Sequence, residues 1–273
     1  MRRAVRQIMS IIFILILFLA LLFTGCGEKR SEQVVIIAHR GASHVAPENT
    51  LAAIKKAVEL GAEYAEVDVF QTKDGEIVLM HDEKLERTTN VKGKIWDFTR
   101  EELKQLDAGS WFGKEFKGEP IPTLREAIQL VRGKMKLNIE IKIKREEPEI
   151  AQKVLDLIRA EEFEKDCIIT SFNRKTVEKV KQIAADIETG FIFDKDYPAG
   201  VFEGSWDALC CDYRLVNQEF ISKARENRKK IYAWTVNSRR VMRRLIDLKI
   251  DGIITNRPGL LRKVLKEQGQ KHS

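Results

Sequence analysis

Charged side chains interrupt short apolar runs of the sequence in a repeated pattern. Glu66 and Asp68 stand two residues apart within one such run, and Glu140 and Lys142 stand two residues apart within another. Alternate residues of a β-strand lie on the same face, so each pair points to one side of its strand. The intervening residues are apolar, and charged groups on a buried face carry a large desolvation cost unless a metal ion or a substrate compensates for it. The pattern therefore indicates a metal-binding or catalytic site.

Two histidines end other apolar runs. His39 is followed by Arg40, and His81 is followed by Asp82. An imidazole changes its charge near neutral pH and can act as a general acid or base, while the planar guanidinium of arginine suits phosphate oxygens. A single histidine beside a strand is more often a hydrogen-bonded structural residue, and a Glu-x-Asp pair is more often the solvent face of a strand. Those structural explanations do not account for all of these groups together.

The apolar runs that carry these residues alternate with amphipathic helical segments along most of the chain. Alternating strands and helices imply a parallel sheet with right-handed crossovers. For 273 residues, the first candidate is the TIM (β/α)8 barrel, which carries its active site at the carboxyl ends of the strands. The charged residues lie toward those ends. The expected strands are residues 34–38, 64–69, 77–80, 137–143, 167–171, 190–193, 208–211, 231–236 and 252–255.

These nine runs exceed the eight strands of a barrel, and a hairpin explains the extra one. Asp74-Gly75, between the second and third runs, is a strong signal for a two-residue turn. That turn predicts that Asp68 lies opposite His81 on the same face of the hairpin. Residues 82–121 contain several glycines and no clear strand–helix unit, so we expect them to form a small insertion.

The composition excludes several classes of protein. With 44% hydrophobic and 33% charged residues, 16 glycines and 6 prolines, the chain is neither disordered nor collagen-like. A net charge of +7 without basic runs interleaved with aromatics does not indicate a nucleic-acid partner. The four cysteines have neither zinc-site nor disulfide-framework spacing. No obligate protein partner is evident from the sequence.

The amino terminus has the pattern of a targeting segment. In residues 1–25, three arginines precede an apolar run that ends at Phe23 and is shorter than the roughly 20 residues needed to span a membrane. The segment resembles a bacterial lipoprotein signal peptide in which Cys26, preceded by the small residue Gly25, becomes the lipidated first residue. Phe23 stands three residues before Cys26, where a lipoprotein signal usually has leucine. An uncleaved membrane anchor is the alternative.

Either form of the leader predicts a protein on the outer face of the bacterial cytoplasmic membrane, attached there by lipid at Cys26 or by the leader itself. We expect residues 26–33 to form a polar tether. A single barrel domain would then span residues 34–265, followed by a polar tail at residues 266–273.

An ordered set of motifs resembles the glycerophosphodiester phosphodiesterase family over roughly residues 34–262. The resemblance implies a TIM barrel with a small insertion after the second histidine. It also implies hydrolysis of glycerophosphodiesters to sn-glycerol 3-phosphate and an alcohol with the help of a divalent metal. The motifs are His39-Arg40-Gly41, Pro47-Glu48-Asn49-Thr50, Glu66-Val67-Asp68-Val69, Thr72-Lys73-Asp74-Gly75, Val78-Leu79-Met80-His81-Asp82, Pro122-Thr123-Leu124, Asn138-Ile139-Glu140-Ile141-Lys142, Trp234-Thr235-Val236-Asn237 and Asp251-Gly252-Ile253-Ile254-Thr255-Asn256-Arg257-Pro258.

The resemblance assigns Glu66, Asp68 and Glu140 as the metal ligands. Three carboxylates suit a hard cation, Ca²⁺ or Mg²⁺, better than Zn²⁺. It assigns His39 and His81 jointly as the acid–base pair, without deciding which of them is the base. The attacking oxygen is the 2-hydroxyl of the substrate's glycerol or a water molecule.

The same resemblance implies substrate contacts for Arg40 at the phosphate and for Lys142 beside the phosphoryl group. Trp234, which ends an expected strand, is a further candidate as a wall of the pocket. For Trp234 a packed core position is the alternative. Asn49 and Thr50 are either a helix cap or substrate contacts.

Two rival functions remain open at this point. A phospholipase that cleaves phosphatidylinositol, or one of the sphingomyelinase D kind, would share the barrel and much of the site. A lipoprotein that only binds glycerol phosphates would have lost a histidine or a carboxylate of the site, and this sequence has lost neither.

Overall fold

The computed structural model describes residues 34–147 and 149–270. The chain divides into two units, residues 1–32 and 33–273, and everything described below belongs to the second unit. The predicted signal peptide, Cys26 and the tether at residues 26–33 therefore lie outside the described residues, as does the end of the predicted tail at residues 271–273.

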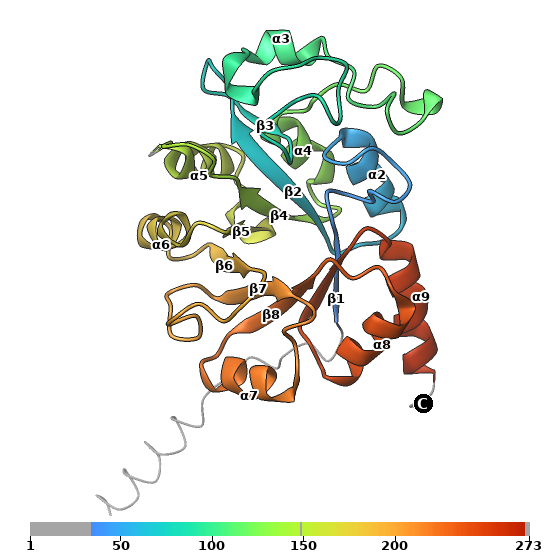
Figure 1. Cartoon of the computed structure of the whole chain (residues 1–273), viewed down its shortest axis with the longest axis vertical. Coiled ribbons are helices and arrows are strands. Elements are labelled where there is room, and N and C mark those ends of the chain that lie inside the picture. Colours follow the sequence, from blue (N-terminus) through green and yellow to red (C-terminus); the bar gives the residue numbers. More distant parts are fainter. Residues whose placement is uncertain (1–33, 148, 271–273) are drawn as a thin grey trace, which may run out of the picture. The chain divides into compact units, whose positions relative to one another are not determined.

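The strands form one sheet that closes on itself. In the part of the chain that the structure describes, eight strands run parallel in the order β1-β9-β8-β7-β6-β5-β4-β2, and β1 pairs with β2 to complete the ring. The predicted TIM barrel is thus confirmed (Figure 1). The strands are β1 (Val35–Ala38), β2 (Tyr64–Gln71), β3 (Ile77–Leu79), β4 (Lys136–Ile141), β5 (Cys167–Ser171), β6 (Glu188–Phe193), β7 (Ala208–Asp212), β8 (Lys230–Trp234) and β9 (Gly252–Thr255).

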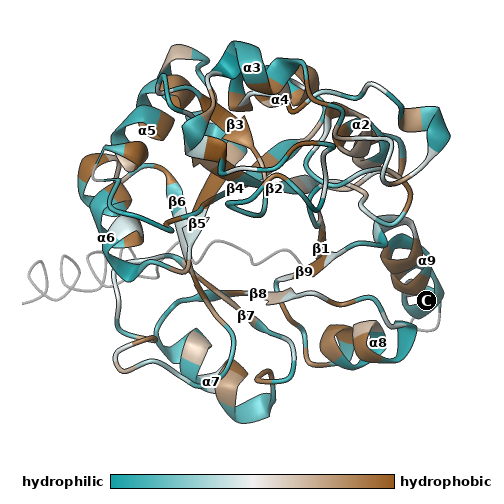
Figure 2. Ribbon diagram, turned by 45° about the horizontal axis from the view of Figure 1, so that its top comes forward, coloured by the Kyte–Doolittle hydropathy of each residue, from teal (hydrophilic) through white to brown (hydrophobic). Residues whose placement is uncertain are grey.

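Helices surround the ring of strands (Figure 2). Most of them connect successive strands, but β6 leads to β7 through residues 194–207, a described segment without a helix. No helix in the described ranges is both long and apolar enough to cross a membrane. The helices are α2 (Leu51–Glu59), α3 (Arg100–Lys104), α4 (Leu124–Val131), α5 (Ile150–Ala160), α6 (Arg174–Ile183), α7 (Gln218–Glu226), α8 (Arg239–Asp247) and α9 (Pro258–Gly269), with the short 3-10 helices η1 (Ile95–Asp97), η2 (Lys114–Phe116) and η3 (Glu164–Asp166).

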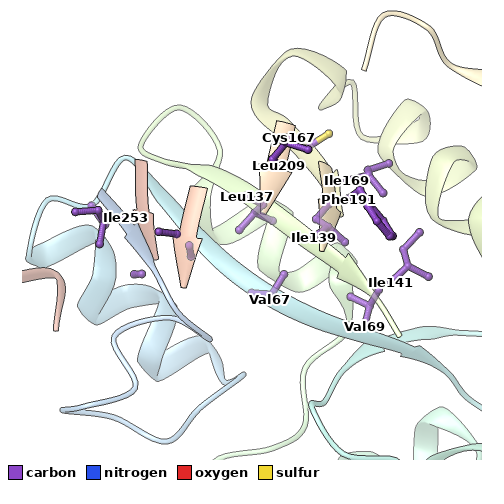
Figure 3. Packing of buried hydrophobic residues seen from close by; sticks show 14 of the residues in the cluster. Val67, Val69, Leu137, Ile139, Ile141, Cys167, Ile169, Phe191, Leu209 and Ile253 are labelled. Carbon is purple, nitrogen blue, oxygen red and sulfur yellow. The ribbon is translucent and has the colours of Figure 1, made fainter. Parts of the chain in front are cut away.

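Alternation along the strands separates two apolar layers. The odd-numbered apolar residues of β2 and β4, such as Val67 and Ile139, belong to the large core cluster that the helices also join (Figure 3). A second, smaller cluster includes Ile37, Cys210 and Ile254, whose strand positions place them inside the ring. The strands are therefore buried on both faces, as expected for a parallel barrel.

Residues between β3 and α4 form the insertion, which has a small core of its own. Val78 and Met80 of the hairpin pack there with Leu85, Ile95 and Leu103. The short helix α3 begins with a capping box in which the Thr99 hydroxyl accepts a hydrogen bond from Glu102 N and the Glu102 carboxylate accepts one from Thr99 N. In Figure 1 this segment extends beyond β3 at the end of the barrel.

The hairpin forms, but its predicted register is wrong by one residue. Val69 pairs with Leu79, and Met80 N donates to Asp68 O at 3.0 Å, so Met80 rather than His81 lies opposite Asp68. The loop has three residues instead of two. A turn closes from Gly75 N to Thr72 O at 3.1 Å, and Gly75 has a φ of +91°. Three-residue hairpin loops commonly end in such a left-handed residue.

A tertiary contact accompanies the longer loop. The Asp74 carboxylate accepts hydrogen bonds from Thr72 Oγ1 at 2.5 Å and from the Arg100 backbone at 3.1 Å, so it links the turn to the start of α3.

Because β3 ends at Leu79, His81 lies on the loop that follows this strand and reaches the barrel mouth from that loop.

Gly41 fixes the path of the loop that carries His39 and Arg40. Its φ is +76°, and a Cβ at this position would lie 2.6 Å from the backbone carbon of Ala53 in α2. Gly41 N also donates to Glu66 O at 3.1 Å. The loop can therefore lie between β2 and α2 only with glycine at this position.

We predict that Gly41→Ala is more destabilising than a matched change at Gly133, whose φ is +70° but whose added Cβ would meet nothing within 4 Å. Gly133→Ala should lower the free energy of unfolding by about 1–2 kcal/mol, the cost of the left-handed conformation. Gly41→Ala should lower it by about 1–3 kcal/mol more, because Ala53 must move. Urea unfolding of both variants measures the difference, and equal losses would contradict the close-packing argument.

Candidate active site

Three carboxylates from two neighbouring strands meet at the mouth of the barrel. Glu66 and Asp68 come from β2 and Glu140 from β4, and all three residues are buried. The parallel register places Asp68 directly beside Glu140. One oxygen atom from each carboxylate lies within 4.8 Å of the others. The pairs that the sequence spacing predicts on single strands thus combine into one cluster.

Lys142 lies among these carboxylates. Its Nζ is 2.7 Å from Asp68 Oδ1 and 2.5 Å from Glu140 Oε1. Burial opposes the charge of Lys142, but the two carboxylates hold its pKa above the ordinary range. Its ammonium group therefore stays charged and offsets part of the negative charge of the cluster.

The remaining negative charge shifts the carboxylate pKa values apart. Burial raises the pKa of Glu66 well above its ordinary value, and the charges of Asp68 and Glu140 raise it further. Burial also raises the pKa of Glu140, to about 7, although Lys142 opposes this shift. Burial disfavours a charge on Asp68 too, but Lys142 and Arg40 hold the pKa of Asp68 below its ordinary range. The protein's own cations are thus insufficient to keep all three carboxylates ionised at neutral pH.

Arg40 holds a second side of the cluster. Its backbone N donates to Glu66 Oε2 at 2.7 Å, its Nη1 donates to Glu48 Oε1 at 2.8 Å, and its Nε lies 3.5 Å from Asp68 Oδ2. Nε is buried and makes no hydrogen bond. A buried guanidinium donor without a partner at this position is available to an anion.

Asn49 positions Asp68 and is not the helix cap. Asn49 Nδ2 donates to Asp68 Oδ2 at 2.8 Å, and Asp68 N donates back to Asn49 Oδ1 at 3.1 Å. Thr50 is the N-cap of α2, and its hydroxyl accepts from Ala53 N at 3.2 Å. The sequence predicted that each of these two residues is either a helix cap or a substrate contact. The structure gives the cap to Thr50 and pairs Asn49 with Asp68. These two hydrogen bonds join residues 19 positions apart, so no local pattern indicates them.

The rings of the two histidines are held by different hydrogen-bond partners. His39 Nδ1 lies 2.6 Å from Asn256 Oδ1, so its ring donates from Nδ1 and leaves Nε2, 4.0 Å from Glu66 Oε2, without a proton. Burial, aided by the charge of Arg40, lowers the pKa of His39 to about 4. Asn256 N donates in turn to Asn237 Oδ1 at 2.9 Å. The sequence motifs contained both asparagines but gave no sign of this support.

His81 instead has a carboxylate behind its ring. His81 Nδ1 lies 2.7 Å from Asp82 Oδ1. Burial lowers the pKa of His81, and the charge of Asp68 opposes that shift. A carboxylate bonded to Nδ1 fixes the tautomer of the ring and favours a proton on it.

A cavity of about 750 Å³ opens beside His81 and Lys142. It lies between the start of the insertion and the loop after β4, and every residue that lines it is charged or titratable. The lining residues are His81, Asp82, Glu83, Lys84, Glu86, Arg87, Lys142 and Lys144.

The aromatic residue predicted to wall the pocket stands at another part of the rim. Trp234 ends β8, is half-buried, and donates from Nε1 to Cys210 O at 3.0 Å. Its ring meets Phe172 edge to face, with 5.7 Å between centroids, and Phe172 is 47% exposed. Lys142 Nζ lies 5.9 Å from the Phe172 ring. Trp234 is therefore half-buried. Phe172, which contacts both Trp234 and Lys142, connects it to the carboxylate cluster.

Comparison with known proteins identifies the fold and the family. The sequence model of the glycerophosphoryl diester phosphodiesterase family matches residues 39–260. A glycerophosphodiester phosphodiesterase of Caldanaerobacter subterraneus subsp. tengcongensis is 40% identical over 246 residues, which cover 87% of this chain and 100% of that protein. One from Bacillus subtilis is 30% identical, covering 86% and 87% of the two chains.

Solved structures agree with the sequence relatives. An Oleispira antarctica phosphodiesterase, in complex with the product sn-glycerol-3-phosphate, has a TM-score of 0.81 and 31% identity, covering 85% of this chain and 96% of that one. A glycerophosphodiester phosphodiesterase of Thermotoga maritima has a TM-score of 0.72 and 31% identity, covering 85% and 98%. The chain therefore belongs to the glycerophosphoryl diester phosphodiesterase family.

Proposed function

We propose that this protein hydrolyses glycerophosphodiesters to sn-glycerol 3-phosphate and an alcohol. One observation carries the proposal: three buried carboxylates, with one oxygen of each within 4.8 Å of the others, lie beside the guanidinium of Arg40 and 4.0 Å from His39 Nε2. His81, bonded to Asp82, lines the adjoining cavity together with Lys142. The product complex of the Oleispira relative, which is 31% identical, supports sn-glycerol 3-phosphate as the product here.

The carboxylate cluster fits a divalent cation. Glu66, Asp68 and Glu140 offer only oxygen donors, which suit Ca²⁺ or Mg²⁺. Burial and mutual repulsion raise the pKa of Glu66 and Glu140, so further positive charge is needed to ionise the whole set. These three residues would hold the ion. When bound, it would offset the charge that builds on the phosphoryl oxygens.

Arg40 and Lys142 are the chain's own contacts for the phosphate. Arg40 Nε is buried without a hydrogen-bond partner, and Lys142 Nζ lies at the same carboxylates. Both cations would hold the phosphodiester over the cluster and keep the phosphorus open to attack. Trp234, at the rim, would contact the glycerol end of the substrate.

The two histidines divide the proton transfers. His39, with an unprotonated Nε2, would take the proton from the attacking oxygen. The new bond to phosphorus forms as the bond to the leaving alcohol breaks. His81, as the imidazolium whose Nδ1–H is held by Asp82, would give its Nε2 proton to the departing oxygen. Water then restores both rings to their starting states.

The cavity beside His81 can bind a polar alcohol. Its lining residues are charged or titratable, so they offer hydrogen-bonding groups to such an alcohol. The leaving alcohol would lie on this side, next to its proton donor. The intact set of carboxylates and histidines weighs against a protein that only binds its ligand.

The leader remains a separate proposal. Residues 1–25 would be removed and Cys26 lipidated, so that the barrel works outside the cytoplasm on the outer face of the membrane. A single acyl chain binds a membrane only marginally, so stable attachment implies more than one chain.

Removal of metal should abolish activity. We expect a chelator to stop the release of sn-glycerol 3-phosphate from glycerophosphocholine, and Ca²⁺ or Mg²⁺ to restore it, because the buried carboxylates lose the cation that offsets their repulsion. Intact phosphatidylinositol and sphingomyelin in the same assay should remain uncleaved. Full activity after exhaustive chelation would rule out the metal assignment, and rapid cleavage of either lipid would favour the rival enzyme.

Each catalytic histidine should be essential for turnover but not for folding. His39→Ala and His81→Ala should each lower kcat by roughly 10²–10⁴-fold, the usual contribution of acid–base groups. His44→Ala is the matched control, because His44 is an exposed residue of the loop after β1, and it should retain activity. Steady-state kinetics and thermal unfolding on the three variants measure both effects. Near-normal kcat in either of the first two would refute the mechanism even with the fold correct.

Cys26→Ser should release a folded, active protein from the membrane fraction or leave an uncleaved precursor, because the acceptor of the lipid is gone. Membrane fractionation and mass spectrometry of the amino-terminal peptide measure this. Recovery of unlipidated wild-type protein from the cytoplasm would overturn the proposal.

A further inference from the structure

Arg87 connects the two loops that carry His81 and Arg40. Arg87 Nε donates to Asp82 Oδ2 on the loop after β3. Its Nη1 and Nη2 donate to Glu48 Oε2 at 3.0 Å and Oε1 at 2.6 Å, on the loop after β1. One guanidinium thus holds carboxylates from two loops that are far apart in sequence.

Each of these carboxylates in turn holds a residue of the proposed chemistry. Asp82 Oδ1 accepts from His81 Nδ1 at 2.7 Å, and Glu48 Oε1 accepts from Arg40 Nη1 at 2.8 Å. A continuous path of charged contacts therefore runs from the proposed proton donor to the proposed phosphate contact. Arg87 stands at the middle of this path and forms no ion pair with the buried carboxylate cluster.

The two carboxylates that Arg87 joins must be ionised for this bridge to hold. Burial disfavours the ionised forms of Glu48 and Asp82, but their hydrogen bonds to Arg87 hold the pKa of each below its ordinary value. Both carboxylates are therefore ionised at neutral pH. The side chain of Glu48 is only 13% exposed, so without Arg87 its charge would have Arg40 as its remaining ion-pair partner within the described residues.

We propose that Arg87 is a positioning residue: through Asp82 it sets the orientation of the His81 ring, and through Glu48 it sets that of the Arg40 guanidinium. This inference rests on the proposed function, because it concerns the two residues to which that function assigns proton donation and phosphate binding. The planar fork of arginine can reach both carboxylates at once, and the single ammonium group of lysine cannot.

The two arms of the bridge predict separable kinetic effects. Asp82→Asn should lower kcat by about 10–100-fold with little change in KM, because a supporting partner of a working group is lost. Glu48→Gln should raise KM about 10-fold, through weaker phosphate binding by Arg40. Arg87→Gln should do both.

Double variants test whether Arg87 acts through these carboxylates. If it does, Arg87→Gln added to Asp82→Asn should cause no further fall in kcat, and Arg87→Gln added to Glu48→Gln no further rise in KM. Multiplicative losses in both pairs would overturn the proposal, because Arg87 would then act on substrate directly. Normal kcat and KM in Arg87→Gln beside an active wild type would overturn it too.

The matched control is Arg125→Gln. Glu161, like Glu48, is a nearly buried carboxylate shared by two arginines, Arg125 and Arg132, but it joins α4 to the end of α5 on the outside of the barrel. Arg125→Gln should change thermal stability alone. A fall in kcat for this variant equal to that of Arg87→Gln would mean that the kinetic loss is a general effect of breaking an ion pair, which would contradict the positioning role.

A measurement without substrate separates this inference from the proposed function. In protein labelled with ¹⁵N-histidine and kept above the pKa of His81, the neutral wild-type ring should have a single tautomer with the proton on Nδ1, and Arg87→Gln should give a mixture. Arg87→Lys, which keeps the charge, should be intermediate if Arg87→Gln does not fold. An inactive wild type with this tautomer change would refute the function and keep the positioning role, whereas an unchanged tautomer would refute the positioning role.

Discussion

Repulsion among three carboxylates inside a packed barrel is the constraint on which the site depends. Glu66, Asp68 and Glu140 lie where water is scarce, so each charge needs a compensating partner. Lys142 supplies one charge, and Arg40 supplies another together with a backbone N–H. The arrangement is still short of positive charge, and that deficit makes it a site for a cation and an anionic substrate.

The barrel makes such a concentration of charge possible. Below the cluster the interior is filled by apolar side chains such as Ile168 and Ile192, and outside the ring the helices cover the strands. The buried carboxylate cluster lies in the upper layer of inward positions, where β-strands end and loops can bring further partners. At the amino ends of the strands Glu188 is paired with Lys230 and Tyr232, and the apolar layer between the two ends separates that group from the site.

The two loops that carry the histidines hold them with different hydrogen-bond partners. His39 follows β1 directly and has a neutral amide behind it, whereas His81 lies past a hairpin on an insertion and has a carboxylate behind it. The second loop extends away from the barrel. The ion pairs of Arg87 with Glu48 and Asp82 connect it to the loop after β1.

Much of the site was visible in the sequence because the relevant signals are local. Alternation within β2 and β4 puts Glu66, Asp68, Glu140 and Lys142 on inward faces, and the apolar neighbours indicate burial on both sides. The order of strands and helices along the chain was enough to predict the barrel. These features depend on residue periods of two or about three and a half, which a single segment expresses by itself.

Contacts between distant segments were decided only by the tertiary structure. His39 meets Asn256 across 217 positions, which becomes possible only when β1 pairs with β9 in the closed ring. The hairpin register also depended on more than its own dipeptide, since Asp74 is shared between the turn and the start of α3. Periodicity assigns a side chain to a face, but closure of the barrel determines which side chains become neighbours, because hydrogen bonds and ion pairs form between groups that the chain separates.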